Sequence, residues 1–148
     1  KIAIPDNVLL KPGKLTDEEQ SIMRTHSSMG REIIDDLLDN FALENIEYID
    51  MLRNIIEYHH ETMDGNGYPQ GIKGQDIPLE SRIVAVADIF DALTSNRPYK
   101  DAWSNDKAFE LLKQLSGKSL DNDCVEALLA NRSEIENIQR CFQDNFYG

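Results

Sequence analysis

Apolar residues recur every three or four positions along most of this chain, which is the spacing that places them on one face of an α-helix. No segment shows the strict alternation of apolar and polar residues that a half-buried strand requires. The pattern therefore indicates an all-α fold. It predicts helices over residues 16–38, with a break near 25–27, and over 46–60, 79–96, 104–116, 121–129 and 133–146.

The same spacing predicts which side of each helix faces the core. Residues 1–13 lack it and are expected to be extended or to form turns. The expected inward residues are Ile33, Ile34, Leu37 and Leu38 on the first helical region, Ile49, Leu52 and Ile56 on the second, and Ile83, Val86, Ala87, Phe90 and Leu93 on the third.

Several helix starts carry capping residues. Thr16 and Glu19 have the spacing of a capping box, in which each side chain accepts a hydrogen bond from the other residue's backbone amide. Further helices are expected to begin after Ser104 and at Asp121 or Asn122, because short polar side chains satisfy the first free amides of a helix. These signals support the helix boundaries that the apolar pattern gives.

The net negative charge of the chain limits which ligands it can bind. The chain has 148 residues, enough for one domain with a core, and a formal net charge of −12. Such a surface argues against binding DNA or RNA, which requires clustered lysine and arginine. It also repels small phosphate ligands unless bound metal ions or a local basic patch reverse the local field. Any phosphate chemistry is therefore expected to be metal-assisted.

The sequence also suggests a compartment. No apolar run approaches the roughly 18–20 residues that span a bilayer, so we expect no membrane contact by this domain. Cys124 and Cys141 form neither a disulfide framework nor a CxxC motif, which is typical of a reduced, cytoplasmic protein.

Four residues are candidate metal ligands: His26, His59, His60 and Asp88. Mixed imidazole and carboxylate sets suit iron, manganese, zinc and similar ions. Neighbouring helical residues point about 100° apart, so the tandem histidines are expected to serve two ions, or an ion and a substrate, better than one shared ion. Asp88 lies in an apolar stretch, where a carboxylate is costly to bury unless it is paired or metal-bound.

Each candidate ligand has a plainer alternative. His26 could cap a helix or bond a backbone group, and the tandem pair could be solvated at a frayed helix end. Asp88 could form an ion pair with Arg82 or Arg97.

Two further features could be functional. Arg97 and Lys100, on a turn stiffened by proline, could hold a phosphate, although cations after a helix are also favoured by the helix dipole. Tyr68 lies in a long loop, 62–78, rich in glycine and proline. Loops of this length are usually functional when ordered. Residues 65–69 could form a flexible lid or a partner-docking surface, or simply a turn that needs positive φ angles.

Together these motifs resemble the HD-GYP domain, a branch of the HD phosphohydrolase superfamily. The resemblance covers residues 1–130, and residues 131–148 carry no motif and are expected to form a terminal helix of the same domain. It depends on His59-His60-Glu61-Thr62-Met63-Asp64-Gly65-Asn66-Gly67-Tyr68-Pro69, Val86-Ala87-Asp88-Ile89-Phe90-Asp91 and Arg97-Pro98-Tyr99-Lys100.

The resemblance implies an HD-domain-like helical bundle that binds two or three divalent metal ions, most often iron or manganese, with zinc, nickel or magnesium as alternatives. It implies hydrolysis of cyclic di-GMP to pGpG and GMP in bacterial signalling. By position, His26, His59, His60 and Asp88 resemble metal ligands, and Arg97 and Lys100 phosphate contacts. Further expected roles are catalytic for Lys1 and Asp91 and substrate-binding for Tyr68.

The resemblance also implies partners. Family members act behind sensory modules and dock GGDEF-domain proteins through the Gly67-Tyr68-Pro69 loop, and exposed apolar surface would favour a homodimer. The family's His-Asp dyad precedes the position of Lys1, so the domain is expected to be N-terminally truncated here. Two alternatives to a cyclic di-GMP phosphodiesterase stay open. One is a catalytically silent nucleotide-sensing or docking module, and the other is an HD-type phosphohydrolase for other nucleotides.

Overall fold

The computed structural model describes residues 2–41, 47–96 and 101–144, and within these ranges the regular elements are helices, besides one isolated bridge between Ser116 and Leu120. The predicted all-α class is confirmed. The elements are α1 (Asp6–Leu9), α2 (Asp17–Arg24), α3 (His26–Phe41), α4 (Ile49–Tyr58), a 3-10 turn η1 (Gly74–Asp76), α5 (Leu79–Thr94), α6 (Asn105–Leu115), α7 (Asn122–Ala130) and α8 (Arg132–Asp144).

The predicted caps begin three of these helices. Thr16 Oγ1 accepts from the Glu19 amide, and the Glu19 carboxylate accepts from the Thr16 amide at 2.7 Å, which completes the capping box of α2. Ser104 accepts from the third amide of α6, and Asp121 accepts from the third amide of α7. Local sequence therefore fixes these helix starts before any tertiary contact forms.

Two boundaries matter for the site. The predicted break in the first helical region is confirmed, because α2 ends at Arg24 and α3 begins at His26. Residues 1–13 were expected to be extended or to form turns, and within them α1 is a single helical turn: the Pro5 carbonyl accepts from the amides of Val8 and Leu9, both at 2.9 Å.

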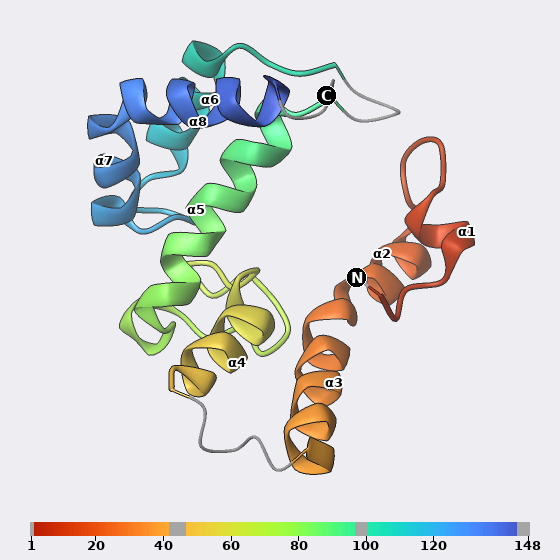
Figure 1. Cartoon of the computed structure of the whole chain (residues 1–148). Coiled ribbons are helices and arrows are strands. Elements are labelled where there is room, and N and C mark those ends of the chain that lie inside the picture. The colour runs from red at the N-terminus through yellow and green to blue at the C-terminus, as the bar shows by residue number, and fades with distance from the viewer. Residues whose placement is uncertain (1, 42–46, 97–100, 145–148) are drawn as a thin grey trace.

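The main core lies between α5, α6 and α7, and Figure 1 shows it at one end of the long helix α5. Phe90 of α5 stacks on Phe109 of α6 with ring centroids 5.1 Å apart, and Leu120 and Val125 are buried against them. Ile135 of α8 packs on this cluster. Burying each large side chain contributes roughly 1.5–3 kcal/mol, so these helices form a stable base for α5.

The opposite end of α5 contacts α4, which in turn packs against α3, with α1 and α2 beyond it (Figure 1). The Ser81 hydroxyl in the first turn of α5 donates to the Asn54 carbonyl of α4 at 2.8 Å. From the core outward, the helices therefore pack in the order α5, α4, α3, α2 and α1. The residues that carry the histidines lie where α3 meets α4.

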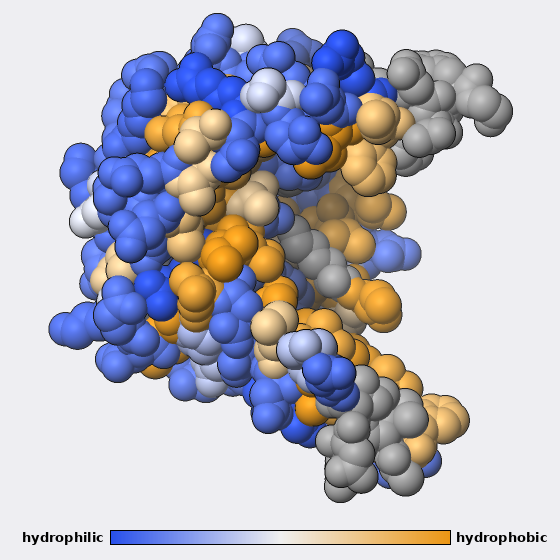
Figure 2. Space-filling view, turned by 60° about the vertical axis from the view of Figure 1, so that its left-hand side comes forward, coloured by the Kyte–Doolittle hydropathy of each residue, from blue (hydrophilic) through white to orange (hydrophobic). Residues whose placement is uncertain are grey.

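Parts of the predicted inward faces are exposed. Ile83 and Ala87 of α5, Ile33 and Leu37 of α3, and Leu52 of α4 were expected in the core, and all five are exposed. On α5 the other helices cover only part of the predicted apolar stripe: Val86 and Phe90 are buried against α6 and α7, whereas Ile83 and Ala87 of the same stripe stay exposed. Figure 2 shows such apolar side chains gathered in the middle of one face.

The longest helices, α3 and α5, have 16 residues each, fewer than the roughly 20 that cross a bilayer. Among the described residues, no helix has both the length and the apolar character that a membrane span needs.

Candidate metal centre

Three imidazole rings converge where the start of α3 meets the end of α4. His26 is the first residue of α3, His59 directly follows α4, and His60 lies in the next turn. One ligand nitrogen of each ring lies within 4.8 Å of those of the other two. The structure therefore brings three of the four candidate ligands into one cluster, which is named here the histidine cluster.

Backbone carbonyls orient two of these rings. His26 Nδ1 lies 2.7 Å from the Met23 carbonyl oxygen, and His59 Nδ1 lies 2.8 Å from the carbonyl oxygen of Ile55. Because a carbonyl only accepts, each Nδ1 carries the proton and each Nε2 keeps a lone pair. Metal-binding histidines are held in this way in many proteins. His60 Nε2 lies 3.2 Å from His26 Nε2, so both face the interior of the cluster.

The expectation that the tandem histidines serve two ions, or an ion and a substrate, stays a prediction. It assumed that His59 and His60 continue a helix, but α4 ends at Tyr58 and His60 is in a turn. The two rings consequently lie side by side, with centroids 4.1 Å apart and planes tilted by 40°. The three donors of the histidine cluster are close enough together to hold a metal ion, and imidazole suits divalent ions such as iron, manganese or zinc.

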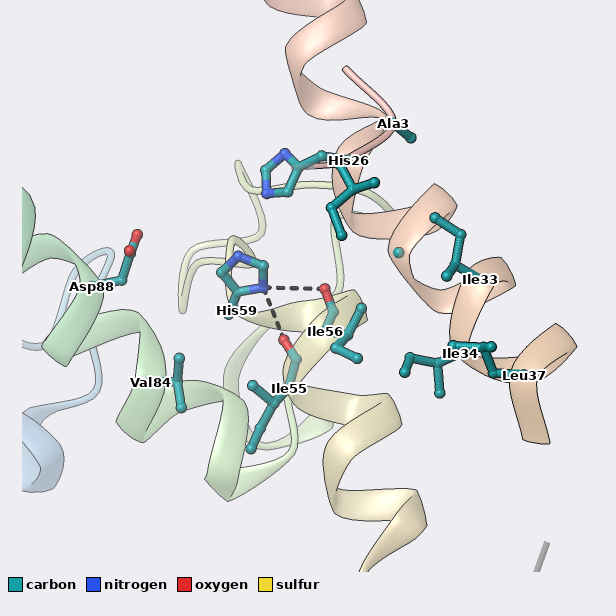
Figure 3. A pocket seen from close by; sticks show the side chains of 12 residues that line it. Ala3, His26, Ile33, Ile34, Leu37, Ile55, Ile56, His59, Val84 and Asp88 are labelled. Carbon is teal, nitrogen blue, oxygen red and sulfur yellow. Dashed lines mark hydrogen bonds between the residues drawn. The ribbon is translucent and has the colours of Figure 1, made fainter. Parts of the chain in front are cut away.

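A cavity of about 540 Å³ opens beside the cluster. Figure 3 shows α3, α4 and α5 around it, with Asp88 on α5 at one side and His59 and His26 at the other. The remaining lining is mainly aliphatic, including Ile33, Ile34, Ile55 and Ile56. A site with few polar groups in an apolar wall is typical of small-molecule binding clefts.

Asp88 was expected to lie among core side chains, and this expectation was wrong: its side chain is exposed, like that of the neighbouring Ala87. Its carboxylate is outside the histidine cluster, although it lines the same cavity. The alternative of an ion pair with Arg82 is also wrong. Arg82 instead pairs with Asp121 on α7, at 2.6 Å.

Asp91 lies one turn after Asp88, and residues three apart share a helix face. Its carboxylate is exposed and accepts a hydrogen bond from Ser95 Oγ at 3.0 Å. Lys1, Arg97 and Lys100 lie outside the described residues, as does the alternative ion pair between Asp88 and Arg97.

Tyr68 covers one side of the histidine cluster. Its ring stacks on His60 with centroids 4.7 Å apart and an interplanar angle of 27°, and it meets His26 edge-on at 6.3 Å. Burial raises the pKa of the Tyr68 hydroxyl to about 12; the Arg24 guanidinium partly opposes this rise and the Asp88 carboxylate adds to it. The hydroxyl therefore stays protonated, as a hydrogen-bond donor, throughout the neutral range.

The loop that carries Tyr68 is more than a turn. Gly65 and Gly71 do adopt positive φ angles, +79° and +68°, as a simple turn requires. Gly67 does not, and it is needed for a different reason: a Cβ atom there would lie 2.5 Å from Glu61 Cα and from the His60 carbonyl oxygen. The loop thus folds back onto the chain at His60.

Sequence reasoning missed two residues of this region. Arg24 lies against the Tyr68 ring, with Cζ 5.4 Å from its centroid. Glu61 is buried, at 3% exposure, although it stands in a polar stretch that gave no sign of burial. A basic residue two positions before a candidate ligand was the available signal for Arg24.

The comparison with family models agrees with this geometry, since the model described as the HD domain matches residues 1–124. The chain belongs to the HD domain family. The resemblance inferred from the motifs is confirmed at that level. This family is metal-dependent, and the histidine cluster is where the described part of this chain could bind an ion.

Curated relatives bear related names. The chain is 49% identical over 138 residues to the cyclic di-GMP phosphodiesterase response regulator RpfG of Xanthomonas campestris, covering 93% of this chain and 35% of that protein. It is 42% identical over 144 residues to a cyclic di-GMP phosphodiesterase of Thermotoga maritima, covering 97% and 37%. A 3'3'-cGAMP-specific phosphodiesterase 2 of Vibrio cholerae is 39% identical, over 97% of this chain and 26% of the relative. The chain thus spans about a third of the length of these relatives.

Proposed function

We propose that this HD domain is part of a metal-dependent phosphodiesterase that hydrolyses cyclic di-GMP to pGpG and GMP. The observation that supports it most is the histidine cluster, with two Nε2 atoms oriented by backbone carbonyls at the rim of a 540 Å³ cavity. The names of the relatives point to the same class of substrate.

His26, His59 and His60 would hold a first ion, and Asp88, across the cavity, would contribute to a second. We propose two or three ions, iron or manganese before zinc, nickel or magnesium, because the ligand set mixes imidazole with carboxylate. When bound, divalent ions at such a site activate water and offset charge on phosphoryl oxygens.

The other side chains bind and orient the substrate. The protonated Tyr68 hydroxyl is a donor beside the histidine cluster, and the guanidinium of Arg24 lies against the same ring. By resemblance, Arg97 and Lys100 contact phosphate, whereas Lys1 and Asp91 act at the reacting group. Cations at these places would counter the net charge of −12, which otherwise repels a dinucleotide.

A turnover assay tests the function. The protein, loaded with Mn(II) or anaerobically with Fe(II), is incubated with cyclic di-GMP, and pGpG and GMP are separated by chromatography. Product formation supports the proposal. Binding of the nucleotide without product favours the silent sensing or docking module instead. A substrate panel with 3'3'-cGAMP and mononucleotides distinguishes an HD-type phosphohydrolase of other specificity.

We predict that His60→Ala or Asp88→Asn removes bound metal and activity together, because each is proposed to bind an ion. Metal content is measured by mass spectrometry of the purified variants beside the turnover assay. An exposed carboxylate far from the cavity, in Asp123→Asn, provides the control and should change neither quantity. Full metal content in both site variants would contradict the assigned roles.

Two partners remain predictions. A GGDEF-domain protein could dock on the Gly67-Tyr68-Pro69 loop, where Pro69 is exposed. A homodimer could cover the exposed apolar side chains of α3 and α4, such as Phe41 and Met51. Co-purification and light scattering, respectively, test them.

A further inference from the structure

Glu61 follows the tandem histidines directly, yet it is not one of the donors of the histidine cluster. Its side chain is 3% exposed. One carboxylate oxygen, Oε1, accepts from the amides of Gln70 and Gly71, at 2.7 and 3.0 Å. A buried carboxylate that accepts two backbone amides fixes the far end of a loop to its near end.

This closure determines where the Tyr68 ring lies. The Tyr68 amide donates to the His60 carbonyl at 3.2 Å, and Gly67 packs directly on the backbone at Glu61. Tyr68 lies between those contacts and the Gln70 amide that Glu61 holds. With both ends of this short segment fixed, the aromatic ring has little freedom and stacks on His60.

The second carboxylate oxygen has a different environment. Oε2 is buried and has no hydrogen-bond partner among the described residues. Glu61 also lines a small cavity of about 10 Å³ together with Arg82, Ser119 and Asp121. This is about the smallest cavity that holds one water molecule, and a water there needs two or more polar partners.

Hydrogen bonds join the residues that surround this small cavity. Arg82 donates through Nε to the Ile77 carbonyl at 3.0 Å and through Nη1 to Asp121 at 2.6 Å, and Asp121 is the N-cap of α7. The Met63 amide, two residues after Glu61, donates to the Ser119 carbonyl at 3.0 Å. Glu61 is thus placed between the loop on one side and the base of α5 and α7 on the other.

We propose that Glu61 is a positioning residue for the candidate metal centre. Through Oε1 it holds the loop that lays Tyr68 on His60, and through Oε2 it binds a single internal water shared with the Arg82–Asp121 pair. It acts through its neighbours and touches neither metal nor substrate. The inference rests on the proposed metal-binding role of His60, although not on turnover.

The test compares Glu61→Ala with Glu61→Gln. Alanine removes both acceptors, whereas the glutamine oxygen can still accept from Gln70 and Gly71. Binding of Mn(II) to the metal-free protein is measured by calorimetry, and the exchange of the Gln70 and Gly71 amides by hydrogen–deuterium exchange. Glu126→Ala, which removes an exposed carboxylate on α7, is the matched control.

We expect Glu61→Ala to weaken Mn(II) binding roughly 10-fold or more, as loss of a residue that supports a metal ligand commonly does. The amides of Gln70 and Gly71 should exchange faster while those of α5–α7 stay protected. Glu61→Gln should restore both quantities toward wild type. Unchanged binding and exchange in Glu61→Ala, or equal losses in both variants, would overturn the positioning role.

Gly67→Ala keeps the test decisive if Glu61→Ala does not fold, because its Cβ clashes with the backbone at Glu61 and opens the same loop without removing the carboxylate. It should weaken Mn(II) binding too, and normal binding would count against the inference. A crystal structure of the wild type should show one ordered water at Glu61 Oε2; a dry cavity would refute that part. Mn(II) binding without turnover would refute the proposed function and leave this inference standing.

Discussion

At the residue scale, three neighbouring side chains set the ionisation of the Tyr68 hydroxyl. Burial against His60 disfavours the tyrosinate, Arg24 favours it, and Asp88 disfavours it. Burial is the largest of these effects, so the phenol is a neutral donor at the rim of a site that is otherwise rich in acceptors. None of the three neighbours is adjacent to Tyr68 in the sequence.

This environment predicts a late tyrosine titration. Followed by absorbance at 295 nm, wild type should show a tyrosinate step near pH 12 that Tyr68→Phe lacks. An unfolded tyrosine titrates near pH 10, so the raised pKa stabilises the fold below about pH 10, and this contribution is lost as the pH rises toward 12. Identical titration curves for the two proteins would contradict the burial of the hydroxyl.

At the scale of elements, α5 connects the core to the site. One side carries the buried Val86 and Phe90, and another carries Asp88 and Asp91. Its orientation is fixed near the N-terminus, where Arg82 pairs with Asp121 at the start of α7 and both side chains are nearly buried. A shift of this helix would therefore move the carboxylates relative to the histidine cluster.

Removing the ion pair between Arg82 and Asp121 should lower the stability of the fold. Breaking one partner of a buried pair costs about 3–5 kcal/mol, so Asp121→Ala should lower the free energy of unfolding by that amount in urea titrations at pH 7. Asp123→Ala, in the exposed first turn of the same helix, should cost under about 1 kcal/mol. Similar losses in both variants would show that the pair contributes little.

The stability that Asp121→Ala loses should depend on pH. Burial alone raises the pKa of the Asp121 carboxyl, but hydrogen bonds from the Cys124 amide and from Arg82 outweigh it, and the net shift is downward. A lowered pKa stabilises the fold above the unfolded value of about 3.9, and this stabilisation is lost as the pH falls through the folded value. The difference between wild type and Asp121→Ala should accordingly shrink in acid.

On the scale of the whole molecule, the histidine cluster lies where two parts of the chain meet. Among the described residues, α1, α2 and α3 meet the rest of the chain chiefly through the packing of α3 on α4. The ion-pair network of Arg31 with Asp35 and Glu57, and of Arg53 with Asp35, reinforces this contact. His26 comes from the first part and the tandem histidines from the second.

An ion bound by all three histidines should therefore link the two parts. At 100 times its dissociation constant, Mn(II) should stabilise the protein by about 2.7 kcal/mol and raise its melting temperature, followed by circular dichroism. The gain should shrink at pH 5, because histidine binds metal in its neutral form, and EDTA should abolish it. An equal gain in His26→Ala would contradict the link.

Local chemistry explains what the sequence predicted correctly. Helix periodicity and the caps at Thr16, Ser104 and Asp121 depend on neighbours within a few residues, so the all-α class and most helix starts could be read directly. The HD family was inferred from the resemblance of the motifs around His59-His60 and Asp88, and the candidate ligands from the chain's three histidines and a carboxylate in an apolar stretch. Their convergence was expected but could not be established, because it requires contacts between distant helices.

Tertiary packing decided the rest. The exposure of Asp88 depends on which side of α5 the other helices cover, and that of Ile83 on how far they extend along its apolar side, since periodicity marks this side without saying what lies against it. The burial of Glu61 depends on a loop folding back over it. The side-by-side placement of the His59 and His60 rings depends on where α4 ends. Sequence determined the elements and the chemical groups; only the fold determined which groups meet, because their contacts join residues far apart in the chain.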